Sequence, residues 1–459
     1  MNSDQSLNID LYELTMAAGY FQNRVDLKAT FELSCHTMPK NRSYLVACGL
    51  EQIIDYVLNL KFSDEDINYL KTLPTFKMVK DDFFDYLKNF SFTGDIWALP
   101  EGEIFFAKEP ILQIEAPIIE AQILETYLLS LMNIECLVAS KATRVVQAAC
   151  FDGMQRGVID FGSRRAHGPQ AAIFAARAAY MAGCLGTSNV SAGKKFGIPL
   201  FGTVAHSWVE TFDTEQESFE KYFKVYPQNT ILLVDTYDTI EAVKKITRLK
   251  FKKDIKGIRI DSGNLKLLSK KIRGILDKEN LGHIKIVASG NLDEYKILDL
   301  VKDQCPIDYF GVGTAMATSY DCPALDLTYK LVQTSSRNNE IKFKKKRSEG
   351  KETIPGRKQI FRKFTDQGFF KADLVGLFSE KQPDDPQGLL KRIVKKGELV
   401  QPLPSLEEIK KYAQKRVSLL PASFFRLDRK QDGKVELSKE IVRLTEFLDS
   451  EVKNNFKGQ

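Results

Sequence analysis

The chain of 459 residues is long enough for two or three domains, each with its own hydrophobic core. Hydrophobic residues make up 43% of the chain and charged residues 27%, which is ordinary for a globular protein and excludes a largely disordered one. The seven cysteines include no CxxC pair and are widely spaced, so reduced thiols explain them better than a disulfide framework or a zinc knuckle.

The first segment of the chain, MNSDQSLNIDLYEL, has neither a basic nor an apolar region, so we expect no secretory signal. The most apolar long run, Ala171–Thr187, is interrupted by Arg177 and is about as short as a membrane-spanning helix can be. We therefore expect a cytoplasmic protein without a membrane partner.

Residues 1–117 mix helical and strand-like patterns. Helical spacing predicts a first helix from Leu11 to Phe21 with Asp10 as its cap, and a second helix over residues 43–60. Strand-like runs follow over residues 95–116 and are broken by prolines, which suits a small antiparallel sheet. We predict a separate N-terminal α/β layer.

A long apolar-periodic helix begins at Ile118, and we predict a break in it near Asn133. Beyond this helix, short apolar runs alternate with mostly helical segments, and the runs are too continuous to be half exposed. Parallel strands covered on both faces have this pattern. The seven runs are VIDFGSRR, CLGTSN, IPLFGTVAHSW, ILLVDTYDT, GIRIDSGN, IKIVASGN and YFGVGTAM.

Each of these runs ends in a polar or glycine-rich turn. The turns of a closed barrel all meet at one mouth, whereas an open doubly wound sheet gathers only those near its switch point. Because all seven ends look specialised, we predict a barrel-like α/β domain over residues 118–325, with the open sheet as the competing architecture. Helices are predicted between the strands at Pro169–Ala182, Val190–Phe196, Thr239–Leu249, Leu265–Asp277 and Leu292–Val301.

Residues 326–459 are predicted to return to the N-terminal layer and to end in helices near Glu407–Ser418 and Ser438–Val452. Between Lys342 and Lys363 the chain carries ten Lys and Arg against two Glu, a local charge of +8. Such a run is usually a solvated face, and a phosphate-attracting rim or a nucleic-acid patch is the alternative.

Several strand ends carry groups that suit an anionic, phosphorylated ligand. The SGN and GVGT turns offer backbone N–H groups for a phosphate, and arginine pairs bidentately with carboxylate or phosphate oxygens. Aspartates there could orient ribose hydroxyls or hold magnesium through water, or they could simply pair with the arginines. These candidates are Arg164, Arg165, Arg259, Asp235, Asp238, Asp261, Ser289–Asn291 and Gly311–Thr314.

His206 is the sharpest single candidate because it follows a buried-looking strand at the predicted mouth. A neutral imidazole is a competent nucleophile toward phosphorus. Metal ligation is the rival role, but no second histidine or cysteine stands beside it at ligand spacing. The residues alone thus indicate a phosphate-handling α/β enzyme and leave open whether His206 is nucleophile, ligand or bystander.

The ordered strings DLYELTMAAGYF, DFGSRRAHGPQ, GTVAHSW, RIDSGNL, VASGNLDE, GVGTAMAT and KETIPGRKQIFR resemble nicotinate phosphoribosyltransferase. The resemblance extends from about Asp10 to Leu406. It implies an irregular α/β barrel with a second α/β domain made from both ends of the chain. It also implies transfer of phosphoribosyl from phosphoribosyl pyrophosphate to nicotinate, coupled to ATP hydrolysis through a phosphohistidine, with Mg²⁺ as cofactor and no metal held directly by protein ligands.

The resemblance also assigns roles to individual residues. It places the phosphohistidine at His206 and a ribose-facing carboxylate at Asp261. It implies a homodimer in which Tyr12 reaches the nicotinate site of the neighbouring subunit. The other implied contacts are Thr203, Phe161 and Arg259 at nicotinate, Arg164 and Arg165 at the carboxylate and 5′-phosphate, and Gly290, Asn291, Gly313 and Thr314 at the phosphoribosyl phosphate, with Asp235 and Ser289 beside them.

Alternatives remain at the level of the substrate. Related nicotinamide enzymes have an aspartate directly after GT, where this chain has Val204, and a buried aspartate would repel a carboxylate. A quinolinate enzyme would require a further basic cluster for the second carboxylate. A nucleic-acid-binding or scaffold protein without catalysis is the alternative outside enzymes, although we expect no nucleic-acid partner.

Overall fold

The computed structural model describes residues 5–348, 352–380 and 388–457, and the chain forms two compact units. Unit 1 comprises Met1–Cys136 and Ala324–Gln459, and unit 2 comprises Leu137–Pro323. The sequence-based boundary at residue 117 falls earlier than this. The reason is that α5 (Ile118–Gln122) packs against the first helix and the central strands of unit 1.

The largest sheet of unit 1 draws on both ends of the chain. Strand β1 (Lys28–Cys35) pairs antiparallel with β5 (Pro110–Pro117) on one side and with β12 (Leu327–Ser335) on the other. The predicted second α/β domain built from the N- and C-terminal parts is thereby confirmed. The full strand order is β13-β12-β1-β5-β3-β16-β17, with β13 at Ile341–Phe343, β3 at Asp95–Ala98, β16 at Lys391–Lys395 and β17 at Glu398–Leu399.

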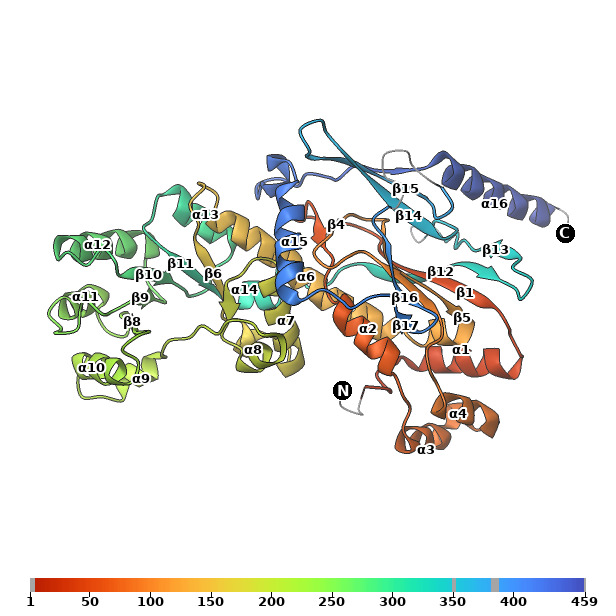
Figure 1. Cartoon of the computed structure of the whole chain (residues 1–459), viewed down its shortest axis with the longest axis horizontal. Helices are drawn as coiled ribbons and strands as arrows, with labels where there is room; N and C mark the ends of the chain where they lie inside the picture. Colours follow the sequence, from red (N-terminus) through yellow and green to blue (C-terminus); the bar gives the residue numbers. More distant parts are fainter. Residues whose placement is uncertain (1–4, 349–351, 381–387, 458–459) are drawn as a thin grey trace. The chain divides into compact units, whose positions relative to one another are not determined.

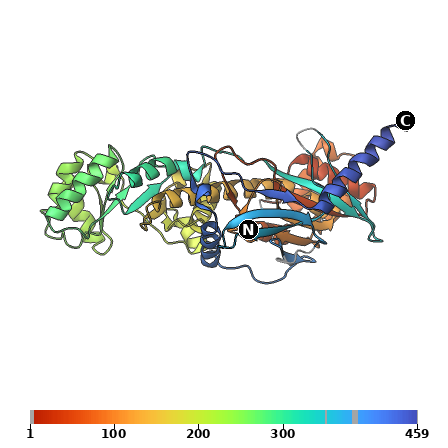
Figure 2. The ribbon, with the colours of Figure 1, turned by 90° about the horizontal axis from the view of Figure 1, so that it is seen from above.

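Smaller sheets and helices complete unit 1. The hairpin of β14 (Lys358–Phe364) and β15 (Phe370–Leu377) lies over the larger sheet and contacts β5 (Figure 2). The other elements are β18 (Val435–Leu437), β2 (Leu45–Val46), β4 (Ile104–Phe105), α1 (Leu11–Gln22), α2 (Leu50–Asn59), α3 (Asp64–Thr72), α4 (Asp81–Lys88), α15 (Leu406–Ser418) and α16 (Lys439–Lys457).

Three local predictions in unit 1 are wrong. The helix expected from residue 43 begins only at Leu50, because Leu45–Val46 pairs with β4 and Gly49, at φ +106°, turns the chain. The long helix α6 (Glu125–Ala149) runs through Asn133, whose side chain instead hydrogen-bonds the backbone of Leu325 at 3.1 Å. Asp10 precedes α1 but its side chain makes no capping bond.

Among the described residues, the helical segment Ile118–Ala149 is long and apolar enough to cross a membrane. In the most apolar window of this segment, 67% of the residues are buried inside the protein. That degree of burial is what the core helix of a globular protein has.

The basic run is only partly solvated: Lys358 and Arg362 are buried and paired within unit 1, whereas other members are exposed, namely Lys342, Lys346, Arg347 and Lys363. Lys358 is fully buried and lies 3.0 Å from Glu32. Arg362 is buried as well, with Glu103 and Asp373 each 2.6 Å from its guanidinium group. Buried charges are tolerated only when they are paired, so these cations hold β14 in place. Residues 349–351 of the run lie outside the described part of the chain.

Unit 2 contains one parallel sheet of six strands in the order β7-β6-β11-β10-β9-β8. All of its pairings are parallel, as the continuous apolar runs predicted. The strands are β6 (Gly157–Asp160), β7 (Gly186–Thr187), β8 (Ile231–Leu233), β9 (Gly257–Ile260), β10 (Lys285–Ala288) and β11 (Tyr309–Val312), and Figure 1 labels all of them except β7.

The strand order of unit 2 is cyclic, because the last strand in sequence, β11, pairs with the first, β6. The third predicted run contributes only a single parallel bridge, between Leu200 and Thr187 of β7. Between Leu200 and β8 the described residues form no ladder. The six strands therefore form one parallel sheet with β7 and β8 at its two edges, and the predicted closure into a barrel stays a prediction.

The five predicted helices of unit 2 begin close to their predicted positions, but three others were not predicted, namely α9, α10 (Glu215–Val225) and α14. Helices α10, α11 and α12 pack side by side along the strands β8–β10 (Figure 1). The helix bounds are α7 Pro169–Met181, α8 Val190–Phe196, α9 His206–Glu210, α11 Thr239–Ile246, α12 Leu265–Lys278, α13 Glu294–Lys302 and α14 Thr314–Ala317.

All seven cysteines are described and none forms a disulfide, as expected for reduced thiols. Six of them are buried, and Cys150 is intermediate in exposure. They are therefore packing residues of the two cores.

Glu13 on α1 gives unit 1 a pH-dependent stability. Its side chain is buried, and this desolvation raises the pKa of the carboxyl group from 4.5 to about 7 despite the hydrogen bonds from Thr126. Because the folded pKa lies above the unfolded one, the protonated group favours the folded state at low pH. This contribution is lost as the pH rises from about 4.5 to about 7.

We therefore expect Glu13→Gln to gain stability relative to wild type when the pH is raised from 5 to 8. The expected gain in the free energy of unfolding is on the order of 2 kcal/mol. The measurement is urea unfolding in a Trp208→Phe background, where Trp97 of unit 1 is the one remaining tryptophan. Glu65→Gln on the exposed surface of α3 reports the general effect of losing a carboxylate. A difference for Glu13→Gln that does not change with pH would contradict the assignment.

Candidate functional site

Arg259, near the end of β9, is the centre of the candidate site in unit 2. Its Nε donates to Ser289 Oγ at 2.8 Å, and its Nη2 lies 2.6 Å from Asp261 Oδ1. Its Nη1 donates to Thr203 Oγ1 at 3.1 Å and to the Val204 carbonyl at 3.3 Å. One guanidinium group thereby joins the ends of β9 and β10 to the segment that follows Leu200.

The carboxylates of the site are linked through the backbone of β9. Asp235, after β8, accepts at Oδ2 from the Asp261 amide at 3.0 Å and from Ser262 Oγ at 2.5 Å. Its other oxygen, Oδ1, is buried and has no hydrogen-bond partner among the described residues. Burial opposes ionisation of Asp261, but hydrogen bonds from Ser289 and Arg259 outweigh it and lower the pKa of this carboxyl group. Asp261 is therefore held as a carboxylate.

His206 is the first residue of the short helix α9, and its ring is half-buried. Its Nδ1 lies 3.1 Å from Oγ1 of Thr236, the residue after Asp235. His206 also interacts electrostatically with Asp261 and helps to lower the pKa of that residue. The segment from Thr203 to His206 is thus attached to β8 and β9 by side chains, at the place where the strand ladder is interrupted.

A tight backbone turn follows β10. Gly290 has φ +89°, and a Cβ atom there would lie 1.8 Å from the carbonyl oxygen of Asp261. Asn291 has φ +49°, and Lys296 Nζ donates to its carbonyl at 2.6 Å. Because only glycine fits this approach, the SGN turn can bring its backbone N–H groups to the strand ends.

Phe161 follows β6 and lies against the end of β11. A Cβ atom at Gly311 would lie 2.4 Å from its ring, so glycine makes room for the aromatic side chain. The Arg259 guanidinium carbon is 5.6 Å from the ring centroid, within cation–π range. The turn after β11 runs through Gly313 to Thr314, which is exposed at the start of α14.

The turn after β6 is held in place by hydrogen bonds to the side chain of Asp160. This buried carboxylate accepts from the Gly162 amide at 2.9 Å and from Thr187 Oγ1 at 2.7 Å. Burial raises the pKa of Asp160 even though these two hydrogen bonds lower it. Arg164 and Arg165 follow on a single 3₁₀ turn with exposed side chains, so they are available to a ligand.

The structure thus brings together most of the residues predicted for the site. Gathered in unit 2 by direct contact are Arg259, Asp261, Asp235, Ser289, Gly290, Thr203, His206 and Phe161, with Asn291, Gly313, Thr314, Arg164 and Arg165 on the turns beside them. Tyr12 lies on α1 in unit 1, where it is 45% exposed and interacts with Glu125. Its predicted role in a neighbouring subunit stays a prediction.

One candidate is reassigned and several residues were missed. Asp238 accepts from the Glu241 amide at 2.9 Å and caps α11, so its carboxylate is a structural group. The alternative that aspartates pair with arginines is confirmed for Asp261 and Arg259. Sequence reasoning did not single out Thr236 or Lys296. Their positions, one residue after a strand-end aspartate and on the helix after SGN, were the available signals.

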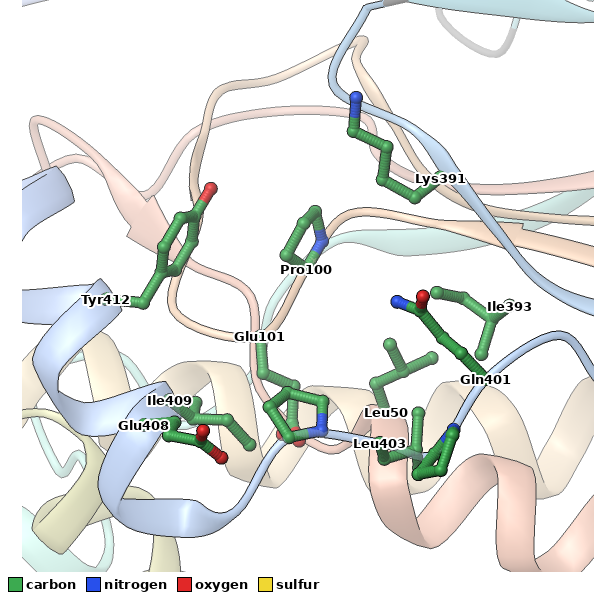
Figure 3. A pocket seen from close by; sticks show the side chains of 12 residues that line it. Leu50, Pro100, Glu101, Lys391, Ile393, Gln401, Leu403, Glu408, Ile409 and Tyr412 are labelled. Atoms are coloured by element: carbon green, nitrogen blue, oxygen red, sulfur yellow. The ribbon is translucent and has the colours of Figure 1, made fainter.

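Unit 1 has a separate cavity of about 370 Å³, which holds none of the predicted site residues (Figure 3). Its lining is mostly apolar, with Tyr412 of α15 and Gln401 among the polar side chains. Glu101, at its lower edge in Figure 3, also lies in a buried cluster with Cys48 and Glu135, whose ligand-type atoms are within 4.8 Å of one another. Within that cluster, Cys48 Sγ donates to Glu135 at 3.2 Å, and Glu101 accepts from the Gly49 amide at 2.6 Å.

Comparison with known families and proteins gives consistent matches along the chain. Residues 7–133 match the nicotinate phosphoribosyltransferase (NAPRTase) N-terminal domain, residues 157–375 the nicotinate phosphoribosyltransferase (NAPRTase) family, and residues 386–445 the nicotinate phosphoribosyltransferase C-terminal domain.

Individual relatives cover nearly the whole chain. A nicotinate phosphoribosyltransferase of Mycobacterium tuberculosis, pncB2, is 43% identical over 421 residues, which are 91% of this chain and 88% of the relative. The nicotinate phosphoribosyltransferase of Bacillus subtilis is 36% identical over 470 residues, covering 95% and 93%. The crystal structure of human nicotinic acid phosphoribosyltransferase superposes with a TM-score of 0.82 at 25% identity, covering 96% of this chain and 99% of the human one.

The turn after β10 yields a direct test of the site geometry. Gly290→Ala would force a side chain at positive φ against the Asp261 carbonyl, so we expect a loss of about 2–4 kcal/mol in stability. Thermal unfolding measures this loss as a lower midpoint. Gly202→Ala is the matched control, because a Cβ atom there meets nothing within 4 Å. Equal midpoints for the two variants would show that the close approach is not present in solution.

Proposed function

The chain belongs to the nicotinate phosphoribosyltransferase family and is an enzyme of this type, and we propose that it uses ATP hydrolysis, through a phosphohistidine at His206, to drive its reaction. In this reaction nicotinate and 5-phosphoribosyl 1-pyrophosphate give nicotinate mononucleotide and pyrophosphate. Such an activity supplies NAD biosynthesis from the free base, and we place it in the cytoplasm.

The observation that carries the assignment of the nicotinate site is the environment of Arg259. Its guanidinium group is partly buried, with 13% of the side chain exposed, and it borders Thr203, Val204 and the Phe161 ring. A planar aromatic carboxylate suits this combination, because the carboxylate pairs with the arginine while the ring stacks on phenylalanine. In the proposed homodimer, Tyr12 of the neighbouring subunit covers the opposite face of the pyridine.

The phosphoribosyl end of the substrate is assigned to the glycine turns. Backbone N–H groups of Gly290, Asn291, Gly313 and Thr314 are suited to the 5′-phosphate. The exposed side chains of Arg164 and Arg165 add positive charge for the phosphate or the carboxylate. Asp261, held ionised, is suited to the ribose hydroxyls.

Magnesium fits the acidic side of the site. The buried Oδ1 of Asp235 lacks a hydrogen-bond partner in the described part of the chain, so it can accept from water bound to an ion. Together with Asp261 it would hold the ion through such waters rather than by direct ligation. When bound, the ion neutralises charge on the departing pyrophosphate.

The reaction depends mainly on how the two substrates are positioned. The pyridine nitrogen forms a bond to the anomeric carbon as the bond from that carbon to pyrophosphate breaks, and no proton has to move. Arg259 and Phe161 orient the nitrogen, and the glycine turns fix the phosphoribosyl group opposite it. Asp261 stabilises the positive charge that spreads over the ribose in the transition state.

The contacts of His206 support the proposed coupling. It faces Asp261 electrostatically and begins a segment whose other end, at Thr203 and Val204, is bonded to Arg259. Phosphorylation would add an anionic phosphoryl group to the ring and would alter the charge around these contacts. We propose that the arrangement reached on phosphorylation is the one that binds the substrates more tightly.

We expect His206→Asn to reduce nicotinate-dependent ATP hydrolysis by at least about a hundredfold, because asparagine cannot accept a phosphoryl group on a ring nitrogen. The ATP-induced decrease in KM for both substrates should vanish, while some basal transfer without ATP remains. Steady-state assays with and without ATP measure both effects. Coupling that persists in this variant would remove His206 from the role.

Selection of nicotinate over nicotinamide is assigned to Val204. An aspartate there would lie next to Arg259 and compete with the substrate carboxylate for its guanidinium group. Val204→Asp should raise KM for nicotinate by about 10- to 100-fold, the cost of one charged hydrogen bond, and narrow the preference over nicotinamide. The uncharged Val204→Asn separates charge from shape. A nicotinate KM equal in the two variants would contradict the electrostatic explanation.

A further inference from the structure

The hydrogen bond between His206 and Thr236 distinguishes the two nitrogens of the imidazole ring. Nδ1 lies 3.1 Å from Thr236 Oγ1, and no other hydrogen bond from His206 is found among the described residues. Thr236 is half-buried three residues after the end of β8, and the side chain of the preceding Asp235 accepts from the Asp261 amide at 3.0 Å. The hydroxyl group therefore holds one particular ring nitrogen.

This contact limits the nucleophilic chemistry of the ring. If Nδ1 carries the proton, it donates to Thr236 Oγ1 and Nε2 keeps a free lone pair. If Nε2 carries the proton, the Nδ1 lone pair is occupied by the threonine hydroxyl and neither nitrogen is free to attack. Only the first tautomer is a nucleophile while the bond exists, and its reactive atom is Nε2.

We propose that Thr236 is a positioning residue that holds His206 Nδ1 and thereby directs phosphorylation to Nε2. The proposal rests on the proposed function, since it requires that ATP phosphorylates His206. The lone pair of Nε2 forms a bond to the γ-phosphorus of ATP as the bond from that phosphorus to the ADP oxygen breaks. ADP leaves with the bonding electron pair, and the proton stays on Nδ1, hydrogen-bonded to Thr236.

The surroundings of the ring favour this product. A ring phosphorylated on Nε2 that keeps its Nδ1 proton is an imidazolium cation, and the Asp261 carboxylate already interacts electrostatically with His206. Arg259 Nη2 lies 2.6 Å from Asp261 Oδ1 and neutralises part of its charge. The guanidinium group and the imidazolium ring therefore share one carboxylate. Thr236 contributes an uncharged acceptor that orients the ring without adding to this charge balance.

The test uses the full-length enzyme with radiolabelled ATP and nicotinate, followed by alkaline digestion and chromatography that separates Nδ1- from Nε2-phosphohistidine. Wild type and Thr236→Ser, which keeps the hydroxyl, should give the Nε2 isomer. Thr236→Val keeps the shape but lacks the hydroxyl, so we expect labelling to be slower by about tenfold and both isomers to form. Thr211→Val removes a hydroxyl that bonds the Ser207 carbonyl on the same helix, and it should behave as wild type.

The outcomes separate this inference from the proposed function. Nδ1-phosphohistidine in wild type would overturn the assignment of Nε2 while leaving the coupling intact. An unchanged rate and isomer in Thr236→Val would overturn the positioning role. The absence of any phosphohistidine in wild type would remove the proposed coupling, and this inference with it. Slower labelling in Thr211→Val as well would show a general disturbance of α9 instead of a specific role for Thr236.

Discussion

The site depends on a single partly buried guanidinium group. Arg259 is tied to a carboxylate, two hydroxyls, one carbonyl and an aromatic face, and these partners come from the ends of β6, β9 and β10 and from the segment after Leu200. A buried cation needs such compensation. Asp261 supplies the opposite charge on one side of the guanidinium group, and the neutral Thr203 and Val204 border another. That asymmetry leaves Arg259 suited to a second anion, which a symmetric pair of carboxylates would have prevented.

Much of this site could be predicted because parallel strands present their ends at one edge. The turns after β6, β8, β9, β10 and β11 were all recognisable as a buried run followed by polar or glycine residues. The close approach at Gly290 explains why a glycine stands there, and the pattern alone pointed to it. What the pattern could not separate was a ligand-facing aspartate from a helix cap, because Asp235 and Asp238 stand three residues apart after the same strand.

Predictions failed where long-range pairing overrides local pattern. Leu45–Val46 continues a helical period in sequence but pairs with β4, which lies much farther along the chain. The basic run is predicted as a solvated face, yet two of its members, Lys358 and Arg362, are buried against carboxylates from elsewhere in unit 1, namely Glu32, Glu103 and Asp373. Asn133 was predicted to interrupt the helix, but its side chain hydrogen-bonds the backbone of Leu325 and the helix continues. Local propensity is a weak guide wherever tertiary contacts decide.

The interruption of the strand order is the feature that links structure to the proposed coupling. A segment held by a full β ladder would resist local rearrangement, because each backbone group has a fixed partner. Residues 201–206 instead have one bridge at Leu200 and then depend on side-chain bonds to Arg259 and Thr236. A change of charge at His206 therefore acts on contacts that can be remade without breaking the sheet. The gap in the strand order thus lies at the place where a switch between two arrangements requires the least disruption.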